Sequence, residues 1–341
     1  MRVAVLMLNL GGPASLAEVR PFLKNLFADR EIIRFPGGAL GQKVFSSLLA
    51  RRKAPSSAQN YAAIGGRSPL VDWTTRQGEG MRVLVEAEAD VELLIQPCMR
   101  YWHPMAEAAL RAAQAFGAEH IVAFKQYPQY STTTTGGSLR DLLRTAGRLG
   151  VTTPITAIER WHEHDPYVAA VAECVREGLS QVPAELRTGT RIVYSAHSLP
   201  MKFVDAGDPY PDQIRRTTEL VHARTGLANA FEIAWQSKVG PVRWLQPSSI
   251  DRIRALPGEG ARDVVVVPIA FVNDHIETLQ ELDRELRHAA ETAGMRTFVR
   301  APSLNVRPAF LRAIADLLLD HLQTVGVRRR PTARSAPCIA P

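Results

Sequence analysis

The chain has 341 residues, of which 46% are apolar and 22% are charged, and these values are typical of a globular protein that folds in water. Its length exceeds what one ordinary hydrophobic core needs and predicts two domains. The formal net charge of +7 is a mild basic bias. Because no nucleic-acid motif accompanies it, this charge does not predict a nucleic-acid partner.

The first residues predict a buried strand rather than a cleaved leader. The opening stretch MRVAVLMLNLGGP runs from apolar residues into Asn9 and a Gly-Gly-Pro turn, whereas a signal peptide needs a longer apolar run and a small-residue cleavage site. No apolar run approaches the roughly 20 residues that cross a bilayer. The cysteines Cys98, Cys174 and Cys338 show no CxxC spacing, which favours a reducing compartment and argues against a four-thiolate cluster.

Short apolar runs alternate with helical patterns along the rest of the chain. The runs are rich in Val, Ile and aromatic residues, and the helical segments often end in glycine. The strand-like runs are RVAVLML, VELLIQP, HIVAFKQYP, TPITAIERW, RIVYSAH, AFEIAWQS and DVVVVPIAF. This alternation predicts an α/β protein with two doubly wound domains, each on a mostly parallel sheet. The lack of a GxGxxG pattern after the first strand argues against a dinucleotide site.

The domain seam is predicted near residues 127–150, where YPQYSTTTTGGS reads as a loop. We therefore expect a first domain over residues 1–128 and a second over residues 129–305. The last helix, about residues 308–325, can pack on either domain. Residues 326–341 are basic and read as a disordered tail.

A histidine lies at the carboxyl end of a predicted strand. In RIVYSAHSLPMKF, residues 191–203, an apolar run ends at His197, and Pro200 prevents an immediate helix. Ligands of open parallel sheets bind outside the carboxyl ends of the strands. His197 is therefore either a hydrogen-bonded core histidine or part of a site.

An acidic stripe follows another predicted strand, in residues 264–286. On a regular helix, Asp274, Glu277, Glu281 and Glu285 share one face. One interpretation is an ordinary solvated helix face, with acids near its start favoured by the helix dipole. However, four carboxylates without an interleaved base repel one another, and metal or proton traffic explains the row better.

Together, these two stretches predict an imidazole and a row of carboxylates at the same edge of one sheet. Both groups suit a divalent first-row metal, and both can take protons near neutral pH. No three-histidine or Cys–His pattern indicates a tightly held zinc. A metal that is bound loosely and passed on fits this donor set.

These residues carry a resemblance to the ferrochelatase family. SAHSLP followed by GDPYPDQ is similar to the family's histidine motif, and VVPIAFVNDHIETLQELD is similar to its glutamate motif. The further matches, in order over about residues 1–325, are LNLGGP, NYAAIGGRSPL, MRYWHP, YPQYS, WQSKVGPVRWLQP and PSLNVRP. Each match is short, but their preserved order makes the resemblance specific.

The resemblance implies insertion of Fe²⁺ into a porphyrin, usually protoporphyrin IX, with release of two protons. It also implies two similar four-stranded parallel domains with the site in a cleft between them, and a C-terminal helix, about residues 306–325, that returns to the first domain. Iron is then a substrate and no cofactor is held permanently. Some members carry a [2Fe–2S] cluster with cysteines mostly in a C-terminal extension; the tail here has only Cys338, so we expect no such cluster.

The resemblance also assigns roles to the residues of the two motifs. His197 would sit over one face of the porphyrin and accept a proton or hold iron, and Glu277 would face it across the cleft. Asp274, Glu281 and Glu285 would relay protons or guide iron, and His275 would support the site. The residues expected to contact the porphyrin are Leu10, Pro13, Lys53, Tyr61, Ser68, Arg100, Tyr101, Tyr130 and Trp244.

Two segments of the first domain keep alternative interpretations. Arg51, Arg52 and Lys53 either pair with porphyrin propionates or form a solvated helix end. Residues 22–49 are unusually apolar and match a family segment that touches the membrane; ordinary helix core is the alternative. The short form of the chain fits a bacterial cytoplasmic enzyme, in possible peripheral contact with the inner face of the membrane, as a monomer or homodimer.

Other functions stay open at this point. A chelatase for coproporphyrin III, or for cobalt, shares the same histidine and glutamate chemistry. A haem or metal carrier without turnover is a different class of protein. A carrier needs a fixed axial ligand and no acidic row, so the stripe over residues 274–285 argues against it.

Overall fold

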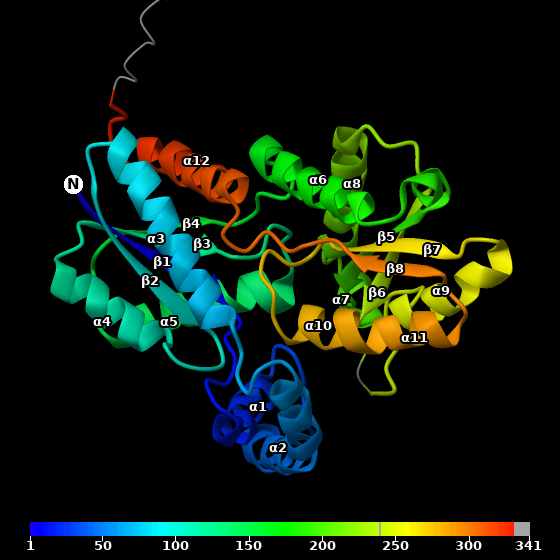
Figure 1. The fold of residues 1–341 in the computed structure, drawn as a ribbon. Helices are drawn as coiled ribbons and strands as arrows, with labels where there is room; N and C mark the ends of the chain where they lie inside the picture. Colours follow the sequence, from blue (N-terminus) through cyan, green and yellow to red (C-terminus); the bar gives the residue numbers. More distant parts are fainter. Residues whose placement is uncertain (239, 331–341) are drawn as a thin grey trace, which may run out of the picture.

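A computed structural model describes residues 1–238 and 240–330, which form two α/β units, each around a four-stranded parallel sheet (Figure 1). The first sheet has the order β2-β1-β3-β4, with β1 (Arg2–Asn9), β2 (Glu92–Met99), β3 (His120–Lys125) and β4 (Ile155–Ile158). The second has the order β6-β5-β7-β8, with β5 (Arg191–His197), β6 (Phe231–Gln236), β7 (Asp263–Pro268) and β8 (Thr297–Arg300). The predicted fold class is confirmed.

The central strands are apolar because helices cover both faces of each sheet. Val3 to Leu8 of β1 and Val264 to Val267 of β7 are almost completely buried. A strand with alternating polar residues would place half of its side chains in an apolar layer. The continuous apolar runs in the sequence are therefore the expected signature of this architecture.

Helices and short helical turns connect the strands. In and around the first sheet they are η1 (Leu16–Glu18), α1 (Val19–Ala28), α2 (Gly38–Ala63), α3 (Leu70–Glu88), α4 (Ala106–Phe116), η2 (Thr132–Gly136) and α5 (Gly137–Arg148). Around the second sheet they are α6 (Asp165–Ser180), η3 (Ala184–Gly189), α7 (Met201–Val204), α8 (Tyr210–Thr225), α9 (Ser249–Ala255), η4 (Leu256–Glu259), α10 (Ile276–Leu279), η5 (Glu281–Leu286) and α11 (Arg287–Thr292). The segments η2 and η5 are π-helical turns.

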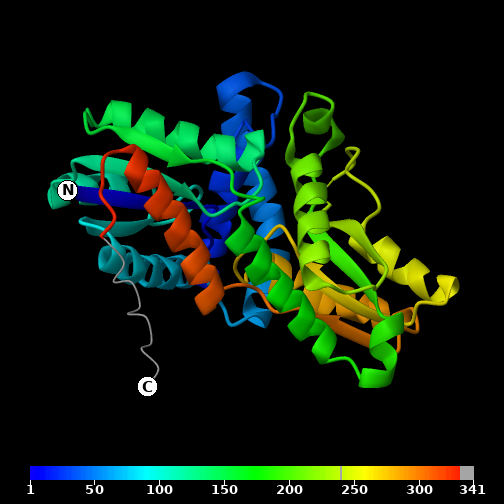
Figure 2. The ribbon, with the colours of Figure 1, turned by 90° about the horizontal axis from the view of Figure 1, so that it is seen from above.

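The last helix, α12 (Pro308–Thr324), joins the two units. It packs against α3 of the first unit and α6 of the second, as seen from above in Figure 2. Its buried Phe310 and Leu318 belong to one apolar cluster that contains Val5 of β1 and Tyr194 of β5. The helix predicted at about 308–325 is therefore present, and it contacts both units rather than one.

The predicted domain boundary at residue 129 is wrong. Strand β4 pairs with β3 in the first sheet, with Ile121 opposite Ile155, so the first unit extends to residue 158. The run TPITAIERW was correctly read as a strand, but its partner is set by long-range packing that the sequence does not show. The stretch YPQYSTTTTGGS, predicted as a loop, instead contains η2 and the first residues of α5.

The start of the predicted tail is ordered by contacts with the first unit. Asp90 N–H donates to the carbonyl of Arg328, and Arg330 N–H donates to the carbonyl of Glu88. The expectation of disorder is therefore wrong for residues 326–330. Its remaining part, residues 331–341, lies outside the described residues.

Helices α1 and α2 form a separate projection below the two units, here called the lip (residues 19–63; Figure 1). Phe22 and Leu23 of α1 pack with Ala50 and Tyr61 of α2 in an apolar cluster that also includes Tyr101 of the first unit. Among the helices of the described residues, none combines the length and the apolar character of a transmembrane span.

Candidate active site

The histidine predicted from the sequence lies at the carboxyl end of the central strand β5, with its side chain 39% exposed. Nδ1 of His197 is 2.6 Å from the carbonyl oxygen of Ser198. A carbonyl can only accept a hydrogen bond, so Nδ1 carries the proton in the neutral ring. The other nitrogen, Nε2, then carries the lone pair of the neutral ring, and it lies 3.4 Å from Glu277 Oε1, with which it forms an ion pair when it is protonated. This is the tautomer that a proton acceptor or metal ligand needs.

Glu277 belongs to the segment that follows β7, and its side chain extends to Nε2 of His197. It lies in the first turn of α10, and its second oxygen is 3.2 Å from Nε2 of His275. Burial raises the pKa of this carboxyl, but the facing imidazoles of His197 and His275 outweigh burial and hold its pKa below the usual value. Glu277 is therefore a carboxylate at neutral pH, held between two imidazoles.

The prediction that Glu277 faces His197 across a cleft is wrong. Both side chains belong to the second unit, and a distance of 3.4 Å leaves no room for a planar ring between them. The carboxyl ends of β5 and β7, which are neighbours in the sheet, meet at the same edge. The pair therefore offers its donors on one side of any bound ligand.

The acidic row does not lie on one regular helix. The segment after β7 divides into α10, the π-helical turn η5 and α11. Glu281 still follows Glu277: its Oε2 accepts hydrogen bonds from Ser237 Oγ at 2.6 Å and from Gln236 Nε2 at 3.2 Å. Burial, followed by the charge of Glu277, raises the pKa of Glu281 to about 7. This carboxyl can take up and release a proton near neutral pH.

The third acid of the row, Glu285, lies at the surface. Glu281 and Glu285 line one cavity of about 260 Å³ together with Ser237, Lys238 and Asp251. The three glutamates thus follow one another from the partly buried Glu277 through Glu281 to the surface at Glu285. The predicted role of these three residues in guiding protons or iron stays a prediction.

Asp274 does not share this row. It precedes α10, and its oxygens accept from Asn305 Nδ2 at 2.8 Å and Ser303 Oγ at 2.7 Å, with Arg300 Nη1 at 3.1 Å. Burial opposes ionisation of Asp274, but Arg300 and these hydrogen bonds lower its pKa. The predicted stripe is wrong at this position, because Asp274 is saturated by partners that hold the loop before α10.

A residue that sequence reasoning missed supports both acids. Gln236 is the last residue of β6, and its Nε2 donates to the carbonyl oxygen of Glu277 at 2.8 Å as well as to Glu281. Its Oε1 accepts from Ser195 Oγ of β5 at 2.8 Å. The available signal was its position, because β6 neighbours β5 and ends at the same sheet edge.

Four of the expected porphyrin residues meet at the edge of the first sheet that faces this site. Ser68 N–H donates to the carbonyl of Pro13 at 2.8 Å. A Cβ at Gly12 would lie 2.5 Å from Ser68 Oγ and 3.7 Å from Tyr61 Oη, so only glycine fits between them. Leu10 and Tyr61 pack in one apolar cluster with Ile276, the neighbour of Glu277. Burial and then the charge of Glu277 raise the pKa of Tyr61.

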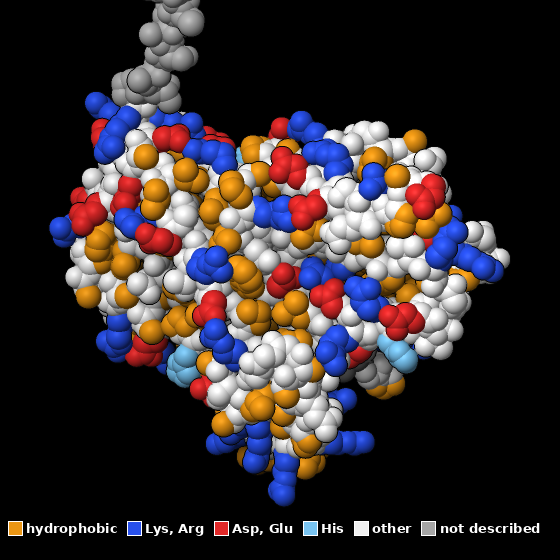
Figure 3. Space-filling view, viewed as in Figure 1, with side chains coloured by type: hydrophobic (Ala, Val, Ile, Leu, Met, Phe, Trp, Pro, Cys, Tyr) orange, Lys and Arg blue, Asp and Glu red, His pale blue; other side chains and the backbone are white. Residues whose placement is uncertain are grey.

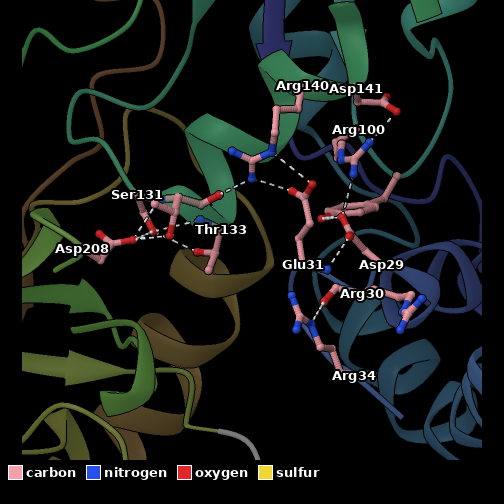
Figure 4. A network of polar contacts seen from close by, with 12 residues as sticks. Asp29, Arg30, Glu31, Arg34, Arg100, Ser131, Thr133, Arg140, Asp141 and Asp208 are labelled. Carbon is pink, nitrogen blue, oxygen red and sulfur yellow. Dashed lines mark hydrogen bonds and ion pairs between the residues drawn. The ribbon is translucent and has the colours of Figure 1, made fainter. Parts of the chain in front are cut away.

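Arg100 and Tyr101 are tied into the first unit instead. The terminal nitrogens of Arg100 pair with Asp29 at 2.8 Å and with Asp141 at 2.6 Å, and its side chain is only 12% exposed (Figure 4). Tyr101 Oη donates to Asp29 at 2.8 Å and is buried. These contacts attach the lip to α5. Arg100 was predicted to contact the porphyrin, but two carboxylates already occupy its terminal nitrogens.

The remaining expected contacts, Lys53, Tyr130 and Trp244, belong to three different segments of the chain. Lys53 is exposed on α2. Tyr130 is partly buried, with Lys125 Nζ 5.6 Å from its ring centroid. Trp244 is partly buried and bridges to Pro200, close behind His197 in the chain. The structure places Trp244 on the histidine side and Lys53 on the lip.

The residues at this site do not form a complete set of metal ligands. Among residues 1–238 and 240–330, no three His, Cys, Asp or Glu side chains converge as a ready-made metal site. His197 Nε2 and the carboxylate of Glu277 supply two donors of the kinds that divalent first-row metals accept. Such a pair can handle a metal ion or protons that come and go.

Comparison with known proteins decides the family. The sequence pattern of the family described as "Ferrochelatase" matches residues 2–322. The chain belongs to the ferrochelatase family. Relatives within this family include the "Ferrochelatase" of Gloeobacter violaceus, 43% identical over 94% of this chain and 98% of that protein. The "Ferrochelatase, mitochondrial" of Homo sapiens is 38% identical over 100% of this chain and 81% of that protein.

Solved structures agree on the fold of this ferrochelatase-family chain. SirB from Bacillus subtilis with Fe³⁺ superimposes with a TM-score of 0.53 over 93% of this chain and 94% of its own, at 14% identity. The sirohydrochlorin chelatase SirB in complex with cobalt gives 0.51 over 93% of both chains. At this identity the likeness establishes the shared fold, and family membership rests on the ferrochelatase relatives.

Proposed function

We propose that this chain inserts Fe²⁺ into protoporphyrin IX, with His197 and Glu277 as its catalytic pair. Family membership gives the reaction class, in which a metal enters a porphyrin and two pyrrole protons leave. The observation that carries the proposal is the geometry of His197, whose Nε2 lies 3.4 Å from Oε1 of Glu277. The macrocycle would lie between this pair and the wall formed by Leu10, Tyr61 and Ser68.

Proton removal is the step that these side chains explain best. Nε2 of neutral His197 accepts a pyrrole proton, and the resulting imidazolium is stabilised by the carboxylate of Glu277. Glu281, whose pKa is about 7, can receive the proton next and pass it toward Glu285 at the surface. The same carboxylates can lead hydrated Fe²⁺ inward along the cavity that Glu281 and Glu285 line.

The first-unit wall favours protoporphyrin over coproporphyrin III. Leu10, Pro13, Tyr61 and Ser68 offer no positive charge, and Arg100 is paired with two acids. Coproporphyrin III has two further propionates where protoporphyrin IX has vinyl groups. A carboxylate buried against this neutral wall without a partner would cost several kcal/mol, on the order of the penalty for an unpaired buried charge.

The proposal is tested by an anaerobic assay with the full chain. Protoporphyrin IX and coproporphyrin III are each offered Fe²⁺, Zn²⁺ and Co²⁺, and kcat/KM is measured by absorbance. We expect multiple turnovers with Fe²⁺ and a higher kcat/KM for protoporphyrin IX. Binding without turnover would identify a haem or metal carrier and contradict the proposal. A higher kcat/KM for coproporphyrin III would overturn the substrate preference alone.

We also propose that the lip contacts an anionic membrane surface. Leu40, Val44 and Leu48 follow one another at helical spacing on α2, and they are 75%, 55% and 62% exposed. The basic residues Lys43, Arg51, Arg52 and Lys53 lie on the same helix, and Figure 3 shows apolar and basic side chains gathered over this end of the molecule. Apolar residues that enter the interface, flanked by cations that meet acidic headgroups, are typical of peripheral binding.

Vesicle cosedimentation tests the lip. The Leu40→Ser/Leu48→Ser variant should bind phosphatidylserine vesicles at least roughly tenfold more weakly, because burying each leucine contributes about 1.5–3 kcal/mol. Val83→Ser is the matched control, since Val83 is also exposed but lies on α3. Unchanged binding of the lip variant, or equal loss in the control, would contradict the proposed contact.

Three expectations from the sequence stay predictions. Cys98 and Cys174 are buried, and burial raises the pKa of each thiol, to about 12 and about 11. Cys338 lies outside the described residues. The expected lack of a [2Fe–2S] cluster is therefore to be checked by the visible spectrum of the purified chain. The cytoplasmic location and the oligomeric state are likewise to be measured.

A further inference from the structure

The segment GDPYPDQ, residues 207–213, follows His197 in the chain but has no role in the chemistry described above. It contains Asp208, which is only 6% exposed. Its Oδ2 accepts from Ser131 Oγ at 2.9 Å, from Thr132 N at 2.8 Å and from Thr132 Oγ1 at 2.7 Å. Its Oδ1 accepts from the N–H of Tyr210 at 3.0 Å. A buried carboxylate with four donors holds its surroundings firmly.

These donors come from different units of the molecule. Ser131 is the N-cap of the helical segment that continues through η2 into α5 of the first unit, and Tyr210 begins α8 of the second. The carboxylate of Asp208 therefore meets the amino ends of two helices, where the helix dipole favours negative charge. Figure 4 shows Asp208 approaching Ser131 and Thr133 from the opposite side of the seam. Next to it, Tyr130 N–H donates to Gln213 Oε1 at 2.7 Å.

Tyr210, two residues after Asp208, holds the main chain of His197. Tyr210 Oη donates to the carbonyl oxygen of His197 at 3.0 Å. On the other side of the same peptide, Ser198 N–H donates to the carbonyl of Gln236 at 2.8 Å. Because Nδ1 of His197 is bonded to the carbonyl of Ser198, the imidazole and this stretch of main chain are fixed together. Burial and the charge of Glu277 raise the pKa of Tyr210, so its hydroxyl stays a donor.

We propose that Asp208 and Tyr210 are positioning residues for His197. Asp208 fixes the second unit against the first, and Tyr210, anchored in the same turn, fixes the peptide that carries the imidazole. The porphyrin-facing wall lies in the first unit and His197 lies in the second, so this turn sets the height of Nε2 above a bound ring. This inference rests on the proposed chelatase function.

The decisive variant is Tyr210→Phe, which removes one hydroxyl and keeps the ring. Misplacement of a catalytic group lowers kcat while ground-state binding persists. We expect kcat for Fe²⁺ insertion to fall about tenfold, with KM for protoporphyrin IX within about twofold of wild type. The matched control is Tyr194→Phe: Tyr194 is buried in the same strand as His197, and its hydroxyl bonds His222 Nδ1 at 3.2 Å, away from the site. Its kcat should equal that of wild type.

A second variant tests the contact that Asp208 makes with Ser131 and Thr132 of the first unit. Asp208→Asn keeps the shape but brings an NH₂ group against backbone and hydroxyl donors, so it should also lower kcat. If both residues act through His197, the double variant loses less than the product of the two single losses. Wild-type kcat in Tyr210→Phe, equal loss in Tyr194→Phe, or fully independent losses would each overturn the proposal. Failure of the wild-type chain to insert metal would instead reject the proposed function.

Discussion

The two units have the same strand order, yet their equivalent strand ends carry different chemistry. Strand β1 of the first sheet occupies the position of β5 in the second, so Asn9 is the counterpart of His197. Asn9 is buried, and its side chain bonds Thr74 Oγ1 and the N–H of Leu10. The side chain of His197 is partly exposed, and its Nε2 faces Glu277. At the edge of the first sheet, the polar side chain of Asn9 is bonded within its own unit. At the edge of the second sheet, His197 and Glu277 are placed to act on a ligand.

His197→Ala tests this division most directly. We expect kcat to fall by a factor on the order of 10³, since removal of a general base costs about 10²–10⁴-fold. The partly exposed side chain leaves no buried cavity, so the thermal midpoint should change little. Asn9→Ala is the counterpart control and should lower stability more than kcat. Substantial turnover in folded His197→Ala would assign the chemistry to another group.

Glu277→Gln separates catalysis from binding within the second edge. Glutamine keeps the shape but removes the charge that stabilises the imidazolium, and we expect kcat to fall about 100-fold. The dissociation constant for protoporphyrin, measured by fluorescence, should stay within about threefold. Glu285→Gln at the surface is the control and should keep most of the activity. A collapse of porphyrin affinity in step with kcat would make Glu277 a binding residue.

Arg100 and Lys53 sharpen the comparison within the first unit. Arg100→Ala leaves Asp29 and Asp141 without their common partner, and the free energy of unfolding should fall by roughly 2–3 kcal/mol. Lys53→Ala removes an exposed cation, so stability should not change, while KM for protoporphyrin rises severalfold if this cation meets a propionate. Urea unfolding and steady-state kinetics check the two results. If Arg100→Ala instead raised KM for protoporphyrin without lowering stability, Arg100 would be assigned to the porphyrin contact.

Glu281→Gln has the smallest expected effect and depends on pH. The pKa of Glu281 is raised from 4.5 to about 7 in the folded chain, so folding favours its protonated form. The wild type therefore loses stability as the pH rises through this window, and the neutral variant does not. The stability advantage of the variant should grow by roughly 1–2 kcal/mol between about pH 5 and about pH 8. A constant difference would show that Glu281 titrates normally.

The sequence was sufficient for the parts of the site that depend on strand ends. Parallel strands that are neighbours in a sheet end at one edge, so a histidine after one apolar run and a glutamate after another predict a shared site. His197 and Glu277 follow this rule. The rule did not predict that His197 and Glu277 lie on the same side of the cleft. It places residues at a sheet edge and does not say which unit lies opposite.

The incorrect predictions share a dependence on distant partners. Asp274 was placed on a helix face, but Arg300 and Asn305 draw it into the preceding loop. Arg100 was expected to contact the porphyrin, but its terminal nitrogens pair with Asp29 and Asp141 from remote parts of the chain. Helical periodicity also assumes a regular helix, and the π-helical turn η5 breaks that assumption. Local pattern carries no information on such long-range pairing.

The position of α12 has a consequence for biosynthesis. This helix is the last element of the described chain, and it closes the joint between α3 and α6. A nascent chain whose residues 308–324 are still inside the ribosome leaves the apolar faces of α3 and α6 uncovered. The emergence of α12 is therefore the step after which the two units can be held together.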